Sequence, residues 1–233
     1  YVGSGLDLYY PFFYDDRVMP ENPSLIFQPV VRYTKEGLSG QEKYKSALAF
    51  VNVSFFKVYK GNLEKDIDKI INIYSKLGVY ANRIRIKISK KEYQYLNKEK
   101  HTIIKFYIDE IETSDILIIE CKNMNFIEYG FGIERMLTSI QDCSYEELFI
   151  KDNCFYYHDD LIKINYLSLI AITESSLKRG AKSIFNKIKT SVQDCIYLDS
   201  LKLLEINYNY WKEVLNSKMS FENFLENYLL LIK

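Results

Sequence analysis

The spacing of apolar residues changes near residue 159, and this change constrains the fold more than any other feature of the sequence. Before it, apolar and polar residues alternate with the period of two that is typical of strands, most regularly in Arg83-Ile84-Arg85-Ile86-Lys87-Ile88. After it, apolar residues recur at helical spacing as far as Lys233. This order predicts an α+β fold, with a mostly antiparallel sheet flanked by helices in residues 1–155 and a helical module in residues 156–233.

Individual elements can be predicted within this order. A helix is expected over 63–77, because Asn62 is a suitable N-cap and Gly78 a suitable C-terminal stop for a segment with one apolar face. The other expected elements are strands at 25–33, 46–58, 83–88, 103–108, 116–121 and 125–129, and helices at 90–96, 133–140, from 161 onward, 201–215 and 221–231.

The composition excludes several classes of protein. The chain has 233 residues, of which 48% are hydrophobic, so it can bury a substantial core. Lys plus Arg and Asp plus Glu both number 31, and this balance argues against a strongly basic nucleic-acid binder. No run of about 18 apolar residues is present, so no membrane span is expected. The opening at Tyr1 lacks the charged and apolar regions of a signal peptide.

The four cysteines give no sign of a zinc site or of a disulfide framework. They are far apart, no C-x-x-C is present, and both histidines are isolated. We therefore expect no metal ligands among them, and we expect a reduced, cytoplasmic location.

The segment Ile127–Met136 carries the clearest chemical pattern. It reads as a strand, two glycines flanking an aromatic residue, and a helix with Arg135 in its first turn. Gly130 and Gly132 would allow a flat ring or a phosphate to approach the backbone, and a guanidinium is a planar fork suited to phosphate. The alternative is a strand-to-helix turn in which the glycines serve sterics alone and Arg135 lies in solvent.

This segment resembles motif 3 of the class II aminoacyl-tRNA synthetases. It is most similar to the alanyl-tRNA synthetase form, Asp-Thr-Gly-Met-Gly-Leu-Glu-Arg-Leu. Upstream, Phe27–Arg32 resembles Ser-Gln-Arg-Cys-Val-Arg at the start of motif 2, and Asn52–Lys60 resembles Asn-Phe-Ser-Phe-Gly-Asp-Tyr-Phe-Lys. The resemblance covers about residues 23–140, with two motifs in the family's order.

The resemblance implies an ATP-dependent ligase that activates an amino acid as its aminoacyl-adenylate and transfers it to tRNA or another acceptor, such as a carrier protein. The cofactors implied are ATP and a Mg²⁺ ion bound through the ATP phosphates. Synthetases of this class are usually dimers paired through motif 1, so a homodimer is also implied. Residues 5–25 are the only candidates for that motif.

The resemblance also implies roles for individual residues. Arg32 would contact the α-phosphate and the substrate carboxylate, and Arg135 would hold the γ-phosphate. Glu128 stands where the family has an Asp that pairs with the α-ammonium of the amino acid. The residues expected next to ATP are Arg32, Phe50, Gly130, Phe131, Gly132 and Arg135.

Each of these assignments has an ordinary alternative. Arg32 would be a surface strand residue, Phe50 a core residue, and Glu128 a solvent-facing residue. Glu134 would be an exposed helix residue or contact a metal through water. The remaining candidates are Lys43 and Lys45 near phosphate, the basic run Lys178–Lys189 as an RNA contact, and Trp211 with Tyr197, Tyr208 and Tyr210 as a partner surface.

The sequence departs from the family in two places. The family's motif 2 carries a Glu near the adenine in Phe-Phe-Glu-Met, whereas the matching stretch here is Ala47-Leu48-Ala49-Phe50. The long insertion that forms the family's alanine pocket is also missing, so alanine is not inferred as the substrate. These departures support an alternative, a catalytically degenerate synthetase-like module that binds a nucleotide, RNA or a partner protein.

Overall fold

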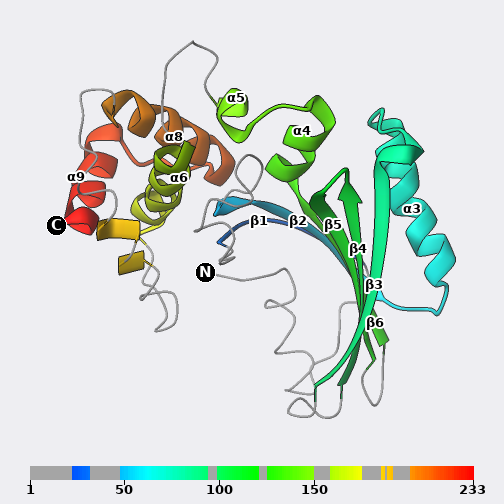
Figure 1. Cartoon of the computed structure of the whole chain (residues 1–233). Helices are drawn as coiled ribbons and strands as arrows, with labels where there is room; N and C mark the ends of the chain where they lie inside the picture. Colours follow the sequence, from blue (N-terminus) through cyan, green and yellow to red (C-terminus); the bar gives the residue numbers. More distant parts are fainter. Residues whose placement is uncertain are drawn as a thin grey trace. The chain divides into compact units, whose positions relative to one another are not determined.

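In the computed structural model of the chain, a six-stranded sheet with the order β1-β2-β6-β5-β4-β3 forms the scaffold (Figure 1). The structure describes residues 23–31, 48–93, 99–120, 125–149, 158–174, 185–186, 188–190 and 200–233. The strands are β1 (Ser24–Val31), β2 (Ala49–Val58), β3 (Ile84–Tyr93), β4 (Glu99–Ile108), β5 (Ile111–Glu120) and β6 (Asn125–Gly132). The pairings β2–β6, β3–β4, β4–β5 and β5–β6 are all antiparallel, which confirms the predicted type of sheet.

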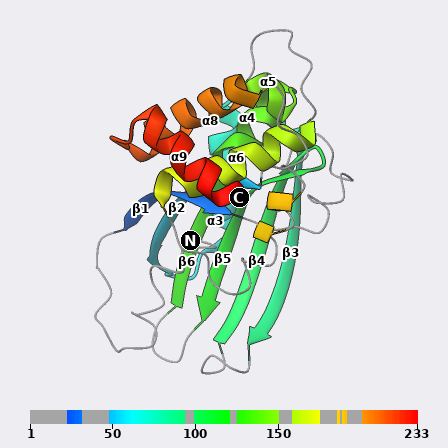
Figure 2. The same ribbon diagram turned by 90° about the vertical axis from the view of Figure 1, so that its left-hand side faces the viewer.

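Helix α3 (Leu63–Lys76) runs along one face of this sheet (Figures 1 and 2). It begins where the sequence predicts, because the side chain of Asn62 accepts a hydrogen bond from the backbone N–H of Lys65 at 3.1 Å. It ends before Gly78, whose φ of +81° is a conformation that glycine adopts readily. The predicted helix over 63–77 is therefore confirmed.

The main hydrophobic core of the sheet region lies between the sheet and its helices. Helix α3 contributes Ile70 and Tyr74, and helix α4 (Ile133–Gln141) contributes Met136. The strands add Val79 from the approach to β3 and a row of side chains from β4, β5 and β6: Ile104, Phe106, Ile108, Ile116, Ile118, Ile127 and Tyr129. Alternation along these strands places this row on one face, and the other face is left for different side chains.

One predicted element is wrong. The sequence predicts a short helix over 90–96, but β3 continues to Tyr93, which pairs with Glu99 of β4. Residues 94–96 lie outside the described part of the chain. Antiparallel pairing gives the backbone of Lys90–Tyr93 ladder partners that the local helical preference of this lysine-rich segment does not outweigh.

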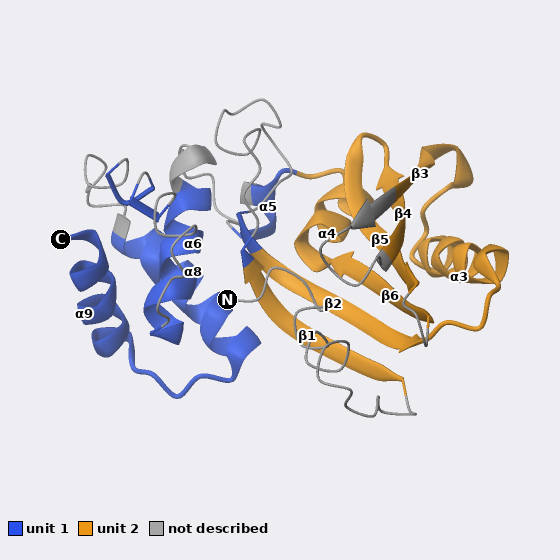
Figure 3. Cartoon of the chain, turned by 90° about the horizontal axis from the view of Figure 1, so that it is seen from below, with its two compact units in different colours: residues 1, 31–49, 144–233 blue, residues 2–30, 50–143 orange. Residues whose placement is uncertain are grey.

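The chain divides into two units, shown in different colours in Figure 3. Residues 2–30 and 50–143 form the unit with the sheet, and residues 1, 31–49 and 144–233 form the other. The second unit contains helices α5 (Tyr145–Phe149), α6 (His158–Thr173), α8 (Ser200–Leu215) and α9 (Phe221–Ile232). The helical character predicted for the C-terminal part is confirmed, although α5 is not predicted.

The helical unit has its own buried centre. Trp211 of α8 is fully buried, and its indole N–H donates to the backbone carbonyl of Asn165 in α6 at 3.2 Å. The side-chain amide of Asn165 donates to Asn207 of α8 at 2.8 Å. Trp211 thus joins α6 to α8 inside the unit, as ordinary helix packing would predict.

Candidate functional site

The two faces of the sheet differ in character. Residues that pair directly across antiparallel strands lie on the same face, so the register assigns each side chain to one side. The face that carries Tyr129 and Phe131 packs against the core with α3 and α4. The opposite face, which we call the polar face, carries Phe50, Asn52, Ser54 and Phe56 of β2, Asp115 and Leu117 of β5, and Glu128, Gly130 and Gly132 of β6.

Glu128 is the buried carboxylate of the polar face. Its side chain is 6% exposed, so the alternative of a solvent-facing residue is wrong. The hydroxyl of Ser54 donates to its Oε1 atom at 2.8 Å, and the side-chain amide of Asn52 donates to the Ser54 Oγ atom at 2.8 Å. This relay of donors fixes the rotamer of Glu128 and stabilises its charged form.

A second carboxylate, that of Asp115, lies across Gly130. The two residues are paired in the register of β5 and β6. A Cβ atom at position 130 would collide with the Oδ1 atom of Asp115, with the Oδ1 atom of Asn52 next nearest at 3.9 Å. Gly130 therefore makes room for an acidic side chain on the polar face.

Phe50, Gly132 and Arg135 form a stack where β6 ends and α4 begins. The guanidinium carbon of Arg135 lies 5.2 Å from the centre of the Phe50 ring, which is the geometry of a cation–π contact. A Cβ atom at position 132 would meet the Phe50 ring at 3.4 Å and the Arg135 Cδ atom at 3.5 Å. The sequence pattern of a glycine followed by a helical arginine thus brings a flat ring and a guanidinium together.

Glu134 fastens the first turn of α4 to β2. Its side chain is 2% exposed, so the alternative of an exposed helix residue is wrong. The backbone N–H of Val51 donates to both of its carboxylate oxygens, at 3.0 Å from Oε1 and 2.9 Å from Oε2. The pairing of β2 with β6 extends to Asn52 and Gly132, so the carboxylate takes the place of a strand partner one residue further along β2.

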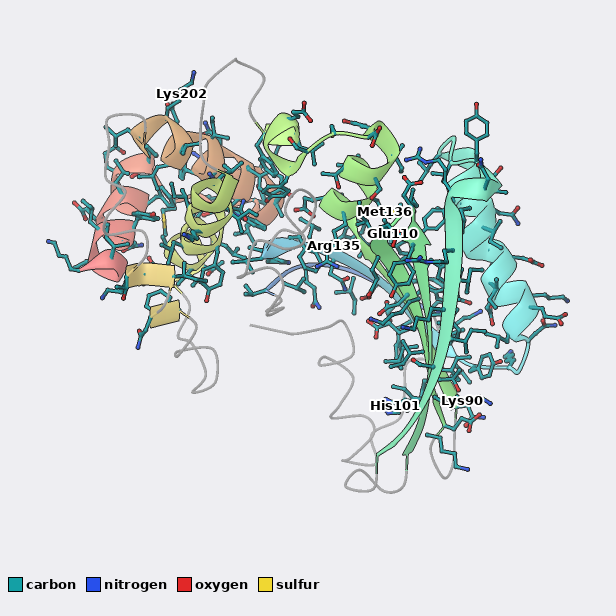
Figure 4. The ribbon with its side chains drawn as sticks, viewed as in Figure 1. Lys90, His101, Glu110, Arg135, Met136 and Lys202 are labelled. Carbon is teal, nitrogen blue, oxygen red and sulfur yellow. The ribbon has the colours of Figure 1, made fainter. Side chains whose placement is uncertain are left out.

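The stack and the buried carboxylate share one face and one strand. Gly132 and Glu128 are four residues apart on β6, which at the rise of a strand separates their Cα atoms by roughly 13 Å. Figure 4 shows Arg135 beside Met136 at one end of the sheet, whereas His101 and Lys90 lie at the other end. The polar face therefore presents a ring and a guanidinium at one end and carboxylates further along.

Other predicted site residues lie elsewhere. Phe131 is on the opposite face, where it packs against the core, and so does not share a face with Phe50 or Glu128. Arg32 lies outside the described residues, and its convergence with Arg135 stays a prediction. Also outside are Lys43, Lys45, Tyr197 and the run Lys178–Lys189 apart from residues 185–186 and 188–189.

Sequence reasoning missed Asp115 and the role of Glu134. Asp115 was detectable, because it falls within the alternating pattern of the strand expected at 116–121 and precedes its first apolar residue. Glu134 offered no comparable signal, because its partner is a backbone N–H 83 residues away. A side chain that bonds to distant backbone leaves no pattern in the sequence.

Two classes of feature are absent from the described part of the chain. The residues that the structure describes hold no group of three or more His, Cys, Asp or Glu side chains arranged for a metal ion. Among the helices of these same residues, none combines the length and apolar character that crossing a membrane requires.

Comparison with known proteins gives distant likenesses. No protein-family model matches the chain. It is 26% identical over 219 residues to the B subunit of the aspartyl/glutamyl-tRNA(Asn/Gln) amidotransferase of Mycoplasma capricolum, and 25% identical over 218 residues to that of Mycoplasma mycoides. Each match covers 87% of this chain and 43% of the relative, so the chain spans less than half the length of these curated relatives.

Among solved structures, the chain is similar to a pyrrolysyl-tRNA synthetase of Desulfitobacterium hafniense. The TM-score is 0.37 at 12% sequence identity, over 60% of this chain and 50% of that one. The names of these three proteins all refer to tRNA, and none of the three is an alanyl-tRNA synthetase.

Proposed function

We propose that the polar face binds ATP and an amino acid and joins them as an aminoacyl-adenylate. The observation that carries the proposal is the combination of the Phe50–Arg135 stack with the buried Glu128 carboxylate on one face of one antiparallel sheet. A ring and a guanidinium suit a purine and its phosphates. A desolvated carboxylate suits an ammonium group. The separation of roughly 13 Å along β6 leaves room for a ligand with a base at one end and an amine at the other.

The chemistry needs little from the protein beyond position and positive charge. An oxygen of the amino acid's carboxylate bonds to the α-phosphorus of ATP, the bond to the bridging oxygen breaks, and pyrophosphate leaves with that electron pair. Arg135 would stabilise charge on the phosphates from the first turn of α4. Arg32 would act at the α-phosphate. Mg²⁺ would be held chiefly by the phosphates, as is usual for this ion in nucleotide sites.

The acceptor of the activated amino acid is proposed to be tRNA. The support is the resemblance of residues 23–140 to class II synthetases, together with relatives that are named for tRNA-dependent amidotransferase activity. A carrier protein is the other acceptor that the resemblance allows. A homodimer and a cytoplasmic location belong to the same proposal.

A second candidate is a synthetase-like module that binds a nucleotide or RNA without catalysis. One observation favours it: Ala49 is fully buried where the family places the acid that lies near the adenine. No carboxylate at this position can contact the base.

The deciding experiment is amino-acid-dependent exchange of pyrophosphate into ATP, measured across the twenty amino acids with and without total tRNA. The proposal expects exchange with at least one amino acid and its loss in Arg135→Ala and Arg32→Ala. A Lys76→Ala variant, changed on the exposed surface of α3, is the control and should exchange normally. Binding of Mg·ATP without exchange would favour the second candidate, and unchanged exchange in both arginine variants would contradict the proposed site.

A further inference from the structure

We propose that Glu134 is a positioning residue that holds the Phe50 ring and the Arg135 guanidinium in register for a purine base. The identity of the ligand rests on the proposed function, whereas the positioning itself follows from the geometry of the chain. Glu134 acts on the stack through the backbone of Val51, whose N–H donates to both of its carboxylate oxygens.

Both members of the stack are sequence neighbours of the bonded pair. Phe50 immediately precedes Val51, and Arg135 immediately follows Glu134. The bond from the Val51 N–H to the Glu134 carboxylate therefore joins the two backbone segments that carry the stack. The register of β2 with β6 runs from Val58 to Asn52, so it stops short of Val51 and Phe50.

Gly132 makes the fit of the stack sensitive to the position of α4. A Cβ atom on this glycine would lie 3.4 Å from the Phe50 ring and 3.5 Å from the Arg135 Cδ atom, so its backbone lies against both members. A shift of α4 away from β2 would open this contact, and a shift toward β2 would press the backbone of Gly132 into the ring. The carboxylate of Glu134 is the group that sets this spacing.

A base that enters the stack needs more room than the two members leave. An aromatic ring inserted between two flat groups needs them about 7 Å apart, which is twice the contact distance of about 3.5 Å. Arg135 lies 5.2 Å from the centre of the Phe50 ring, so the stack is closed in this structure. A base would displace the side chain of Arg135 while Glu134 keeps the two backbones fixed. The guanidinium then returns to a defined place above the bound base.

The test compares Glu134→Ala and Glu134→Gln with Glu64→Gln in the full chain. Glu64 is a matched control, because it is an exposed glutamate in the first turn of α3, so both substitutions remove the same favourable charge from a helix N-terminus. The first readout is the NMR shift of the Arg135 side-chain protons, which the Phe50 ring displaces. A Phe50→Leu variant gives the value without a ring. The second readout is the dissociation constant of Mg·ATP.

Positioning predicts that the Arg135 shift in Glu134→Ala moves to the Phe50→Leu value and that Mg·ATP binds about 10- to 100-fold more weakly. Glu134→Gln should fall between, because an amide oxygen still accepts one bond from Val51. Glu64→Gln should match the unsubstituted protein. An unchanged Arg135 shift in both Glu134 variants would overturn the inference. If Glu134→Ala fails to fold, the Gln variant decides. If the unsubstituted protein binds no Mg·ATP, the proposed function fails, and the NMR shift alone still judges the positioning.

Discussion

The phenol of Tyr129 donates a hydrogen bond to the buried carboxylate of Asp66, and this bond ties β6 to α3. Lys69 also donates to the same carboxylate oxygen at 2.7 Å, and Lys57 lies 3.5 Å from it. The strand that carries Glu128 and Gly130 on the polar face is therefore anchored to a helix through its other face.

Removing this anchor should destabilise the sheet unit. We expect Tyr129→Phe and Asp66→Asn each to lower the free energy of unfolding by about 1–3 kcal/mol, because each leaves a buried polar group with a poorer partner. Urea unfolding followed by far-UV circular dichroism measures the loss. Asp68→Asn, on the exposed side of the same helix, is the control and should change stability little. Equal stability of all three variants would show that the bond contributes nothing.

The same anchor should make stability depend on pH in the acid range. Burial raises the pKa of Asp66, but the hydrogen bonds from Lys69 and Tyr129 and the charge of Lys57 outweigh burial and hold this pKa below its ordinary value of 3.8. The ionised carboxylate therefore contributes stability above about pH 4, and this contribution is lost as the pH falls through the folded-state pKa. The stability difference between the unsubstituted protein and Asp66→Asn should shrink from pH 6 to pH 2.5. A constant difference would contradict this assignment.

An alkaline effect of opposite sign is expected from Tyr129. Burial, and then the bond to the Asp66 carboxylate, raise the pKa of its phenol well above the ordinary value of 10.0. The neutral phenol contributes stability below about pH 10, and this contribution is lost as the pH rises further, because the unfolded chain ionises first. Tyr129→Phe should lose less stability than the unsubstituted protein between pH 9 and pH 11. Parallel curves would show that Tyr129 does not titrate with unfolding.

The room that Gly130 makes for Asp115 can be tested by a double-mutant cycle. Gly130→Ala should destabilise the protein by about 1–3 kcal/mol, because the added methyl group collides with the Asp115 carboxylate. In an Asp115→Ala background the same change should cost less, since the nearest remaining side-chain atom is then 3.9 Å away. Gly132→Ala, whose nearest neighbour is the Phe50 ring at 3.4 Å, is a milder comparison. Additive effects of the first two changes would exclude the proposed packing.

The role of Glu128 can be separated from that of the nucleotide stack. Glu128→Gln keeps an oxygen that accepts from Ser54 but removes the charge that an ammonium group requires. The KM for the amino acid in pyrophosphate exchange should rise about 10- to 100-fold, as expected for a charge-assisted bond of about 1.5–3 kcal/mol. The dissociation constant of Mg·ATP should stay the same. Glu120→Gln, at the exposed end of β5, is the control. A rise in the Mg·ATP constant instead would place Glu128 in the nucleotide site.

The parts of the structure that the sequence predicted are those with local causes. The helix over 63–77 follows from its cap, its apolar face and Gly78, and the strand beginning at Ile84 follows from strict alternation. The segment 90–96 was misread because the pairing partner of its first half lies beyond the next turn. The polar face was only partly predicted for the same reason. Glu128 was found through its motif, but its orientation depends on Ser54, a residue 74 positions away.

The separation of β2 from its partner in the chain has a consequence for synthesis on the ribosome. β2 is complete at Val58, but β6, which pairs with it, begins only at Asn125. The hairpins of β3, β4 and β5 can close in the meantime, because their partners are adjacent in the chain. A ribosome that pauses between these points holds a nascent chain in which Asn52 and Ser54 are already made but have no neighbouring strand on which to meet an acid.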